Sequence, residues 1–395
     1  MRRNGQGTST SFFQISDVDL DAFKISCEQS VQPERYPLAA DIISNVVIYD
    51  GADLRAAANG DSDSVNAFQN EMADVLLHGP GVFAIKGFYA KTSIIDAMSQ
   101  VFEQILENER GYGAGDHFGK TGPQANGRIW NVFQKSAEAN PEVFVHYYKN
   151  PLLQIVSEAW LGPHYQMTAQ VNIVRPGGAA QVSHRDFHLG FQQPQETARY
   201  PIHIQQMSAM LTLQGAVAHT DMPLESGPTK LLPFSQHYPL GYMAYHEKAF
   251  QDYFENNYVQ VPLEKGDAVF FNPALFHAAG ENRTLDFHRS ANLLQVSSAF
   301  SKPMETVDLA HICRKVYPVL LNLWRNDALS PDEKNAIITT ATDGYSFPTN
   351  LDTDPPIGGL APESMEALLH RALDEDMQAA TFEVALAQLR EKQRA

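Results

Sequence analysis

The sequence predicts an α+β protein with a mainly β core and with helices flanking that core on its N-terminal and C-terminal sides. Between about residues 165 and 300, short apolar or alternating runs are separated by turn residues, which is typical of an all-β sandwich or barrel. On both sides of this region, apolar residues recur at helical spacing. We therefore expect one domain over residues 16–300, with its β core at about 165–300, and a helical extension over residues 301–395.

The N-terminal flank of the core is expected to contain two helices and a strand. An amphipathic helix is predicted over residues 64–78, where a Gly-Pro-Gly turn ends it. A short buried strand follows at residues 82–85, and Thr92 is placed to cap a helix that runs to about Glu109. Residues 110–128 are rich in glycine with scattered charge, which indicates a mobile loop near a site.

The core itself is expected to contain short strands between turns that are rich in Gly, Pro, Ser and Asp. The four clearest apolar runs are residues 170–174, 208–213, 268–271 and 291–296. The turns between them fall at residues 175–178, 225–228 and 264–267. Strands with this punctuation bring distant parts of the chain to the same surface of a sheet.

The C-terminal extension is predicted to be helical. Residues 330–333 read Ser-Pro-Asp-Glu, a capping box with proline at the first helical position. Apolar residues recur at helical spacing over residues 363–392, and residues 355–359 form a connector between the two helical parts. We expect this extension to pack on the core or on a second subunit, and therefore consider a homodimer through these helices.

Composition excludes several classes of partner. The formal net charge is −17, which argues against nucleic acid or an anionic membrane as a partner, because phosphate binding favours a basic surface. Cys27 and Cys313 are the only cysteines, so there is neither a disulfide framework nor a CxxC zinc pattern. No apolar run approaches the roughly 20 residues of a membrane span. Residues 1–15 lack the apolar stretch of a signal peptide and are expected to be a disordered tail of a soluble cytoplasmic protein.

The segment from Gln181 to Asp186, which reads Gln-Val-Ser-His-Arg-Asp, carries the strongest chemical signal. On a β-strand, residues i and i+2 point to the same face, so His184 and Asp186 can converge on one metal ion. A third ligand from another strand, His277, would complete the 2-His-1-carboxylate facial triad of mononuclear Fe(II) sites. The pattern His-x-Asp is weak evidence alone, because His219 and Asp221 repeat it.

Three downstream features distinguish the two copies. A Gly-Asp turn at residues 266–267 leads into an apolar strand that delivers His277 to its far end. Residues 225–237 read Glu-Ser-Gly-Pro-Thr-Lys-Leu-Leu-Pro-Phe-Ser-Gln-His. Arg289 lies on the next predicted strand among apolar residues. A buried guanidinium requires an anionic partner, and a bidentate carboxylate suits its planar fork.

In this order, the motifs resemble those of the phytanoyl-CoA dioxygenase family of Fe(II)/2-oxoglutarate oxygenases, over roughly residues 70–300. The resemblance implies that the β core is a double-stranded β-helix (jelly roll) and that the domain binds Fe(II) and 2-oxoglutarate. It further implies that His184, Asp186 and His277 are the catalytic iron ligands. The family's order of motifs selects this His-x-Asp and leaves His219 and Asp221 as a pair in the loop before the Gly-Pro-Thr segment.

The same resemblance implies three contacts to 2-oxoglutarate. Arg289 corresponds to the basic residue that holds the distal carboxylate, and Gln181 and Thr229 correspond to further contacts. The family arginine more often lies eleven residues after the distal histidine, and that position here is His288. Because a shift of one residue moves a side chain to the other face of a strand, either the turn is one residue longer or Arg283 or His288 takes part.

The resemblance implies oxidation, by molecular oxygen, of an unactivated C–H bond in a small metabolite or natural-product intermediate, with succinate and CO2 as co-products. A carboxylate at Asp186 points to hydroxylation or a related oxidation, because related halogenases need a small residue there. Two alternatives stay open: a non-catalytic jelly roll that binds a ligand, and a hydrolase or isomerase that uses Zn or Mn on the same ligands. The identity of the substrate is not predicted.

Overall fold

The computed structural model describes residues 10–109 and 126–394. Residues 1–9 of the expected tail and most of the expected glycine-rich loop, residues 110–125, lie outside the described residues. At the described end of the tail, the carbonyl of Ser11 accepts a hydrogen bond from the amide of Ile202.

The largest element of the fold is a mixed sheet of eight strands in the order β1-β2-β3-β8-β6-β10-β5-β4. Its neighbours pair antiparallel, except that β2 and β3 are parallel. The strands are β1 (Asp41–Ile43), β2 (Val46–Asp50), β3 (Val82–Lys86), β4 (Gly127–Ile129), β5 (Gln166–Val174), β6 (Thr212–Ala218), β8 (Ala268–Phe271) and β10 (Arg289–Ser297). A second sheet pairs β7 (Lys230–Leu232) with β9 (Phe276–Ala278).

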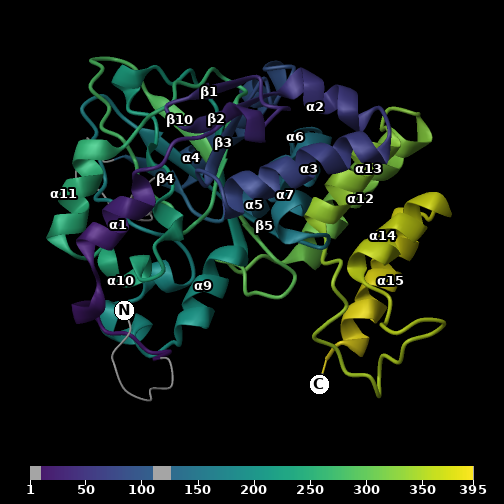
Figure 1. Cartoon of the computed structure of the whole chain (residues 1–395). Helices are drawn as coiled ribbons and strands as arrows, with labels where there is room; N and C mark the ends of the chain where they lie inside the picture. The colour runs from purple at the N-terminus through teal and green to yellow at the C-terminus, as the bar shows by residue number, and fades with distance from the viewer. Residues whose placement is uncertain (1–9, 110–125, 395) are drawn as a thin grey trace.

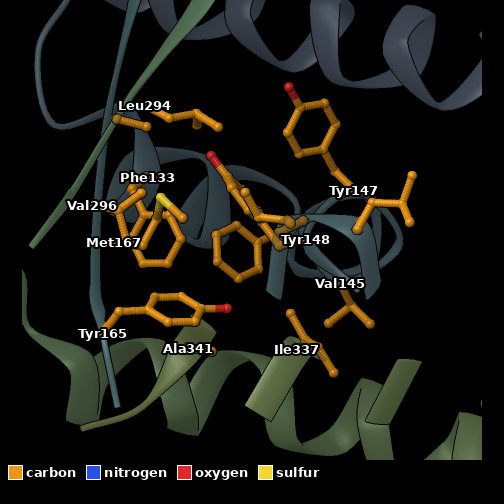
Figure 2. Close-up of a cluster of buried hydrophobic side chains, with 14 of the residues drawn as sticks. Phe133, Val145, Tyr147, Tyr148, Tyr165, Met167, Leu294, Val296, Ile337 and Ala341 are labelled. Atoms are coloured by element: carbon orange, nitrogen blue, oxygen red, sulfur yellow. The ribbon is translucent and has the colours of Figure 1, made fainter. Parts of the chain in front are cut away.

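Helices cover one face of the large sheet and form its apolar core. The helices that share this core are α2 (Gly51–Ala58), α3 (Ser62–Leu77), α4 (Ser93–Asn108), α5 (Val132–Ala139), α6 (Pro141–Tyr148), α7 (Pro151–Leu161), α12 (Leu309–Arg325), α13 (Pro331–Ala341), α14 (Met365–Asp374) and α15 (Ala379–Lys392). Figure 2 shows part of this core, in which Met167 of β5 and Val296 of β10 lie near Tyr148 of α6 and Ile337 of α13. The strand residues that point to this face alternate with residues that point to the other.

The other face of the large sheet meets the second sheet across a separate apolar cluster. Leu231 of β7 packs there with Ala216 of β6, Val269 of β8 and Ala291 of β10. The helices on this side of the molecule are α1 (Leu20–Cys27), α8 (Pro194–Thr197), α9 (Ile202–Met210), α10 (Gly241–Ala244) and α11 (Lys248–Asn257). In Figure 1, α1, α10 and α11 lie at the opposite end of the molecule from α14 and α15. A large sheet with flanking helices is thus confirmed, and the jelly-roll connectivity stays a prediction.

Most of the expected elements form where the sequence places them. The helix at 64–78 is α3, the strand at 82–85 is β3, and the strand at 268–271 is β8. The capping box is present, because the Ser330 hydroxyl accepts from the amide of Glu333 and the Glu333 carboxylate accepts from the amide of Ser330. The apolar pattern over 363–392 forms two helices, α14 and α15.

The strand predicted at residues 208–213 is wrong for most of its length. Residues 208–210 end helix α9, and the strand in this region, β6, begins only at Thr212. A short apolar run does not distinguish a strand from a buried helix end by its periodicity. Pro201 at the N-cap position begins the helix, and Ser208 and Ala209 are its buried residues in this stretch.

The C-terminal extension packs on the helical layer of the same chain. Helix α12 contacts α5 and α6, and α13 contacts α7 and β5. Within the extension, the ring of Tyr317 stacks on Phe382 with 4.0 Å between ring centroids. None of the described helices combines the length and the apolar character needed to cross a membrane.

Candidate metal centre

His184, Asp186 and His277 converge, and their ligand atoms all lie within 4.8 Å of one another. His184 and His277 form a single antiparallel bridge, in which each amide donates to the other's carbonyl at 3.0 and 3.1 Å. The amide of Asp186 donates to the carbonyl of Pro273 at 3.0 Å. These backbone bonds attach the His184–Asp186 segment to the chain around His277 and bring the three side chains together.

The local structure of these segments differs from the expectation in two respects. His184 and Asp186 do not lie on a regular strand but on an extended segment with one bridge residue. His277 lies on β9 rather than at the far end of β8, because a turn at residues 272–275 separates the two strands. In that turn, the side chain of Asn272 accepts from the amide of Ala274 at 2.9 Å. The proline that follows Asn272 has no N–H to continue the ladder.

Both imidazoles turn the same nitrogen toward the carboxylate. Nδ1 of His184 lies 2.9 Å from the carbonyl of Val182, and Nδ1 of His277 lies 2.8 Å from the carbonyl of Leu275. A carbonyl can only accept, so each Nδ1 carries the proton and each Nε2 keeps its lone pair. The Nε2 atoms lie 3.8 and 3.6 Å from the oxygens of Asp186. Two neutral imidazole nitrogens and one carboxylate therefore face a common point.

The protonation states at this point suit a metal ion. Burial opposes ionisation of Asp186, but the neighbouring His184 and His277 and a hydrogen bond from Gln214 lower the pKa of Asp186 to about 2. Burial lowers the pKa of His184, and the neighbouring His277 lowers it further. Metal ligands must be deprotonated, so these shifts favour binding near neutral pH.

Two residues that support the triad were not expected from the sequence. Nε2 of Gln214 donates to Oδ2 of Asp186 at 2.5 Å and fixes the orientation of the carboxylate. Arg185, between the two ligands, is only 2% exposed, and its Nη2 donates to the carbonyls of Ser235 and Tyr238 at 2.6 and 3.0 Å. A polar residue within the apolar run of β6 is the one sequence signal that points to Gln214.

Arg289 opens β10 and is only 5% exposed. Its Nη1 donates to the carbonyl of Ser226 at 3.4 Å, and burial lowers its pKa to about 10. Of the three basic candidates, Arg289 alone lines the cavity beside the triad, whereas Arg283 and His288 are exposed. Asn282 donates to the carbonyls of Val174 and Phe287 and so holds the preceding loop, whose length sets Arg289 opposite Val174.

The remaining two predicted contacts line the same cavity. Oε1 of Gln181 accepts from the amide of Ala279 at 3.2 Å, and Thr229 is partly buried beside β7. The cavity has a volume of about 550 Å³ and includes the triad, Arg289 and residues from β5, β6, β8 and β10. Its size is in the range of sites for small molecules.

The second His-x-Asp copy forms no metal site, and its two side chains bond to other residues. His219 is only 4% exposed and bonds Ser99 through Nδ1 at 2.8 Å and Tyr147 through Nε2 at 2.9 Å. Asp221 is exposed and accepts from the amide of Lys265. Among the described residues, His184, Asp186 and His277 are the one group of His, Cys, Asp and Glu side chains placed to hold a metal ion.

Comparisons with known proteins agree with this geometry. The profile of the family "Phytanoyl-CoA dioxygenase (PhyH)" matches residues 77–291. The dioxygenase cdmD of Talaromyces verruculosus is 28% identical over 176 residues, which are 45% of this chain and 53% of that protein. The dioxygenase trt7 of Aspergillus terreus is 22% identical over 231 residues, which are 58% of this chain and 74% of that protein. The chain thus spans about half the length of cdmD.

Solved structures show a distant likeness. The carbocyclase SnoK of nogalamycin biosynthesis, described as non-heme and α-ketoglutarate-dependent, has a TM-score of 0.43 and 18% identity. That alignment covers 65% of this chain and 92% of SnoK. The epimerase SnoN in complex with Fe³⁺, α-ketoglutarate and nogalamycin RO has a TM-score of 0.42 and 14% identity, over 62% of this chain and 93% of SnoN. The profile match covers more than half of the 395 residues and includes the triad and Arg289, and the chain therefore belongs to the phytanoyl-CoA dioxygenase family.

Proposed function

We propose that this protein is a dioxygenase that hydroxylates, or otherwise oxidises, an unactivated C–H bond of a small metabolite or natural-product intermediate. Iron and 2-oxoglutarate are the metal and the co-substrate that family membership and the His-Asp-His triad support. When bound, they supply the oxidation of the C–H bond by dioxygen, with succinate and CO2 as co-products. The convergence of His184, Asp186 and His277 is the observation that carries the proposal.

The donor set of the triad fits iron. Two imidazole nitrogens and one carboxylate oxygen, with no thiolate among them, are the ligands of non-heme Fe(II) oxygenases. The backbone carbonyls of Val182 and Leu275 hold both imidazoles with Nε2 toward the site. Gln214 holds Asp186 in turn, so each of the three ligands is fixed by a second contact before any metal binds.

The surroundings of Arg289 fit the distal carboxylate of 2-oxoglutarate. The guanidinium is buried, and no ion pair joins it to an acidic side chain of the described residues. Apolar side chains of Met222, Leu231 and Phe271 line the same cavity. A buried cation in such surroundings is costly unless an anion pairs with it. A dicarboxylate with one end at the triad and the other end at Arg289 would supply that negative charge. Gln181 and Thr229 line the same cavity and would bind its oxygens.

The proposal is tested by measuring formation of succinate from 2-oxoglutarate under air with added Fe(II). We expect His184→Ala and Asp186→Ala to abolish it, because each removes one of three protein ligands. Arg289→Met should raise the KM for 2-oxoglutarate by about 30-fold or more, since loss of one partner of a buried charged pair costs about 2–5 kcal/mol. His219→Gln, in the second His-x-Asp copy, is the matched control and should retain turnover.

Each alternative function gives a different outcome. A hydrolase or isomerase would keep its activity without oxygen, with Zn or Mn in place of iron, and Arg289→Met would have little effect. A protein that only binds a ligand would form no succinate, whereas the oxygenase would bind Fe(II) in stoichiometric amounts and turn over 2-oxoglutarate. Equal loss of turnover in His184→Ala and His219→Gln would contradict the assignment of the metal site.

A further inference from the structure

The floor of the cavity is divided into an apolar half and a carboxamide half. Near Arg289, the strand β10 contributes Ala291 and Leu293, which lie opposite Ala218 and Ala216 of β6. Two residues further along the same face, Gln295 lies directly opposite Gln214. The apolar half surrounds Arg289, which the proposed function pairs with 2-oxoglutarate, so the carboxamide half is left for the other ligand of the site.

Strand β5 places two further carboxamides on the same face of the sheet, beside the apolar half. Gln170 and Asn172 alternate along β5 and line the same cavity, and the register places them opposite Leu293 and Ala291. Residues that face each other across an antiparallel pair point to the same side of the sheet. Gln170 and Asn172 therefore lie level with the apolar half, and Gln214 and Gln295 stand apart from them as a pair.

Three of these carboxamides have an oxygen without a partner. Oδ1 of Asn172, Oε1 of Gln214 and Oε1 of Gln295 are buried and accept no hydrogen bond within the described part of the chain. The residues themselves are only 8%, 5% and 6% exposed. Nearly all buried polar groups in folded proteins are satisfied, and each exception requires an explanation such as an absent ligand.

The orientation of Gln214 identifies the kind of partner that is missing. Nε2 of Gln214 donates to Oδ2 of Asp186, so the amide nitrogen is the atom that faces the carboxylate. The free end of Gln214 is therefore its oxygen, an acceptor. Gln170 differs, because its oxygen accepts from Nη1 of Arg128 and its nitrogen lies 3.4 Å from the sulfur of Met304.

We propose that Gln214 and Gln295, the carboxamide band, bind the hydroxyl groups of the substrate. The substrate class that fits is an alcohol with at least two O–H donors on a compact carbon skeleton. Phe191 and Met304 line the same cavity and provide apolar contact for that skeleton. This inference rests on the proposed function. Because Gln214 also donates to Asp186, a hydroxyl bound at Gln214 lies next to the triad.

The first test measures thermal unfolding of the metal-free protein. If the band is reserved for a ligand, Gln295→Leu will leave the melting temperature unchanged or raise it, because replacing an unsatisfied buried polar group removes a cost. The matched control is Asn292→Leu on the other face of β10, where Nδ2 donates to the hydroxyls of Tyr147 and Tyr148 at 3.2 and 3.3 Å. The control should lower the melting temperature. A comparable loss in Gln295→Leu would mean that the band is structural and would overturn the inference.

The second test uses cyclohexanediol as the probe and its dimethyl ether, which has the same skeleton without O–H donors, as the comparison. Crystals of the full chain with Zn(II) and 2-oxoglutarate are soaked with each compound. We expect diol hydroxyls on the oxygens of both Gln214 and Gln295, no ether in the band, and loss of the diol in the Gln295→Leu variant. Diol bound elsewhere, or ether bound equally well, would overturn the inference.

The two proposals fail in distinguishable ways. The zinc form does not turn over, so the position of the diol is independent of catalysis. Wild-type protein that forms no succinate but orders the diol on the band would contradict the oxygenase function and leave alcohol recognition intact. Succinate formation together with a band that excludes the diol would contradict the substrate class alone.

Discussion

At the scale of single residues, the surroundings of a histidine decide what it does. His184 and His219 both stand two residues before an aspartate, but only His184 turns a free Nε2 toward its aspartate. His219 uses both ring nitrogens, on Ser99 and Tyr147, and lies against the ring of Phe102 at 5.0 Å between centroids. It is a buried structural residue of the helical layer, on the face of the sheet away from the cavity.

This burial predicts an acid-sensitive contribution to stability. Desolvation lowers the pKa of His219 to about 3, whereas an unfolded histidine titrates near 6.5. Between these values the unfolded state binds the proton more tightly, so the contribution is complete above about pH 6.5 and falls as the pH falls towards 3. At pH 5, the contribution of His219 to the free energy of unfolding of the wild type should therefore be about 2 kcal/mol smaller than at pH 7.

Urea unfolding of the wild type and His219→Gln at several pH values from 5 to 7 measures this contribution. The variant should show the shallower dependence on pH, even if its stability at pH 7 is lower. Parallel curves for the two proteins would mean that His219 is already protonated in the fold or is not buried as described.

At the scale of elements, the short segment that carries two metal ligands is anchored by the residue between them. The guanidinium of Arg185 bonds two carbonyls of residues 235–238 and lies over the rings of Tyr242 and Phe276, 5.2 and 5.3 Å from their centroids. Gly241, the first residue of α10, leaves the space for it, because a Cβ there would overlap the guanidinium. Burial lowers the pKa of Arg185 to about 10, which leaves it charged at neutral pH.

We therefore expect Arg185→Met and Gly241→Ala each to weaken binding of Fe(II) by about 10- to 100-fold, the usual effect of losing a contact that orients metal ligands. Arg185→Lys should recover only part of the affinity, because an ammonium cannot reproduce the planar fork. Gly359→Ala is the control, since the nearest atom to its added Cβ is 3.9 Å away. Titration of the metal-free proteins with Fe(II) under nitrogen measures these affinities. Unchanged affinity in both test variants would show that Arg185 does not position the ligands and that the bridge to His277 is sufficient.

Most of the elements and the metal ligands could be predicted from the sequence, but the contacts that orient those ligands could not. Apolar runs and turn residues located β8 and α3, and residue spacing located the triad, because these signals lie within short stretches of the chain. Arg185 and Gln214 could not be predicted, since their roles depend on which carbonyl or carboxylate the fold places beside them. The position of Arg289 likewise depends on the bonds that Asn282 makes in the preceding loop. Contacts of this kind are set by register and loop length, which periodicity does not report.

At the scale of the whole molecule, the C-terminal extension and the family domain share one apolar cluster. Leu368, Phe382 and Leu386 of the extension belong to the same buried cluster as Val171 of β5 and Phe270 of β8. The hydroxyl of Tyr317 donates to the carbonyls of Ala372 and Met377 at 3.0 and 2.7 Å, which ties α12 to the chain after α14. Elements that share a core lose their packing together, so the extension is expected to unfold with the sheet that positions the site.

Calorimetry of the full chain should accordingly show one cooperative transition, coincident with loss of near-ultraviolet circular dichroism and of metal binding. Leu368 is fully buried, and Leu368→Ala should cost about 2–5 kcal/mol and shift all three signals together. Leu360→Ala is the control, because Leu360 is 98% exposed and its truncation removes no buried contact. Two resolved transitions, with Leu368→Ala moving only one of them, would show that the extension is an independent unit and that the metal site does not depend on it.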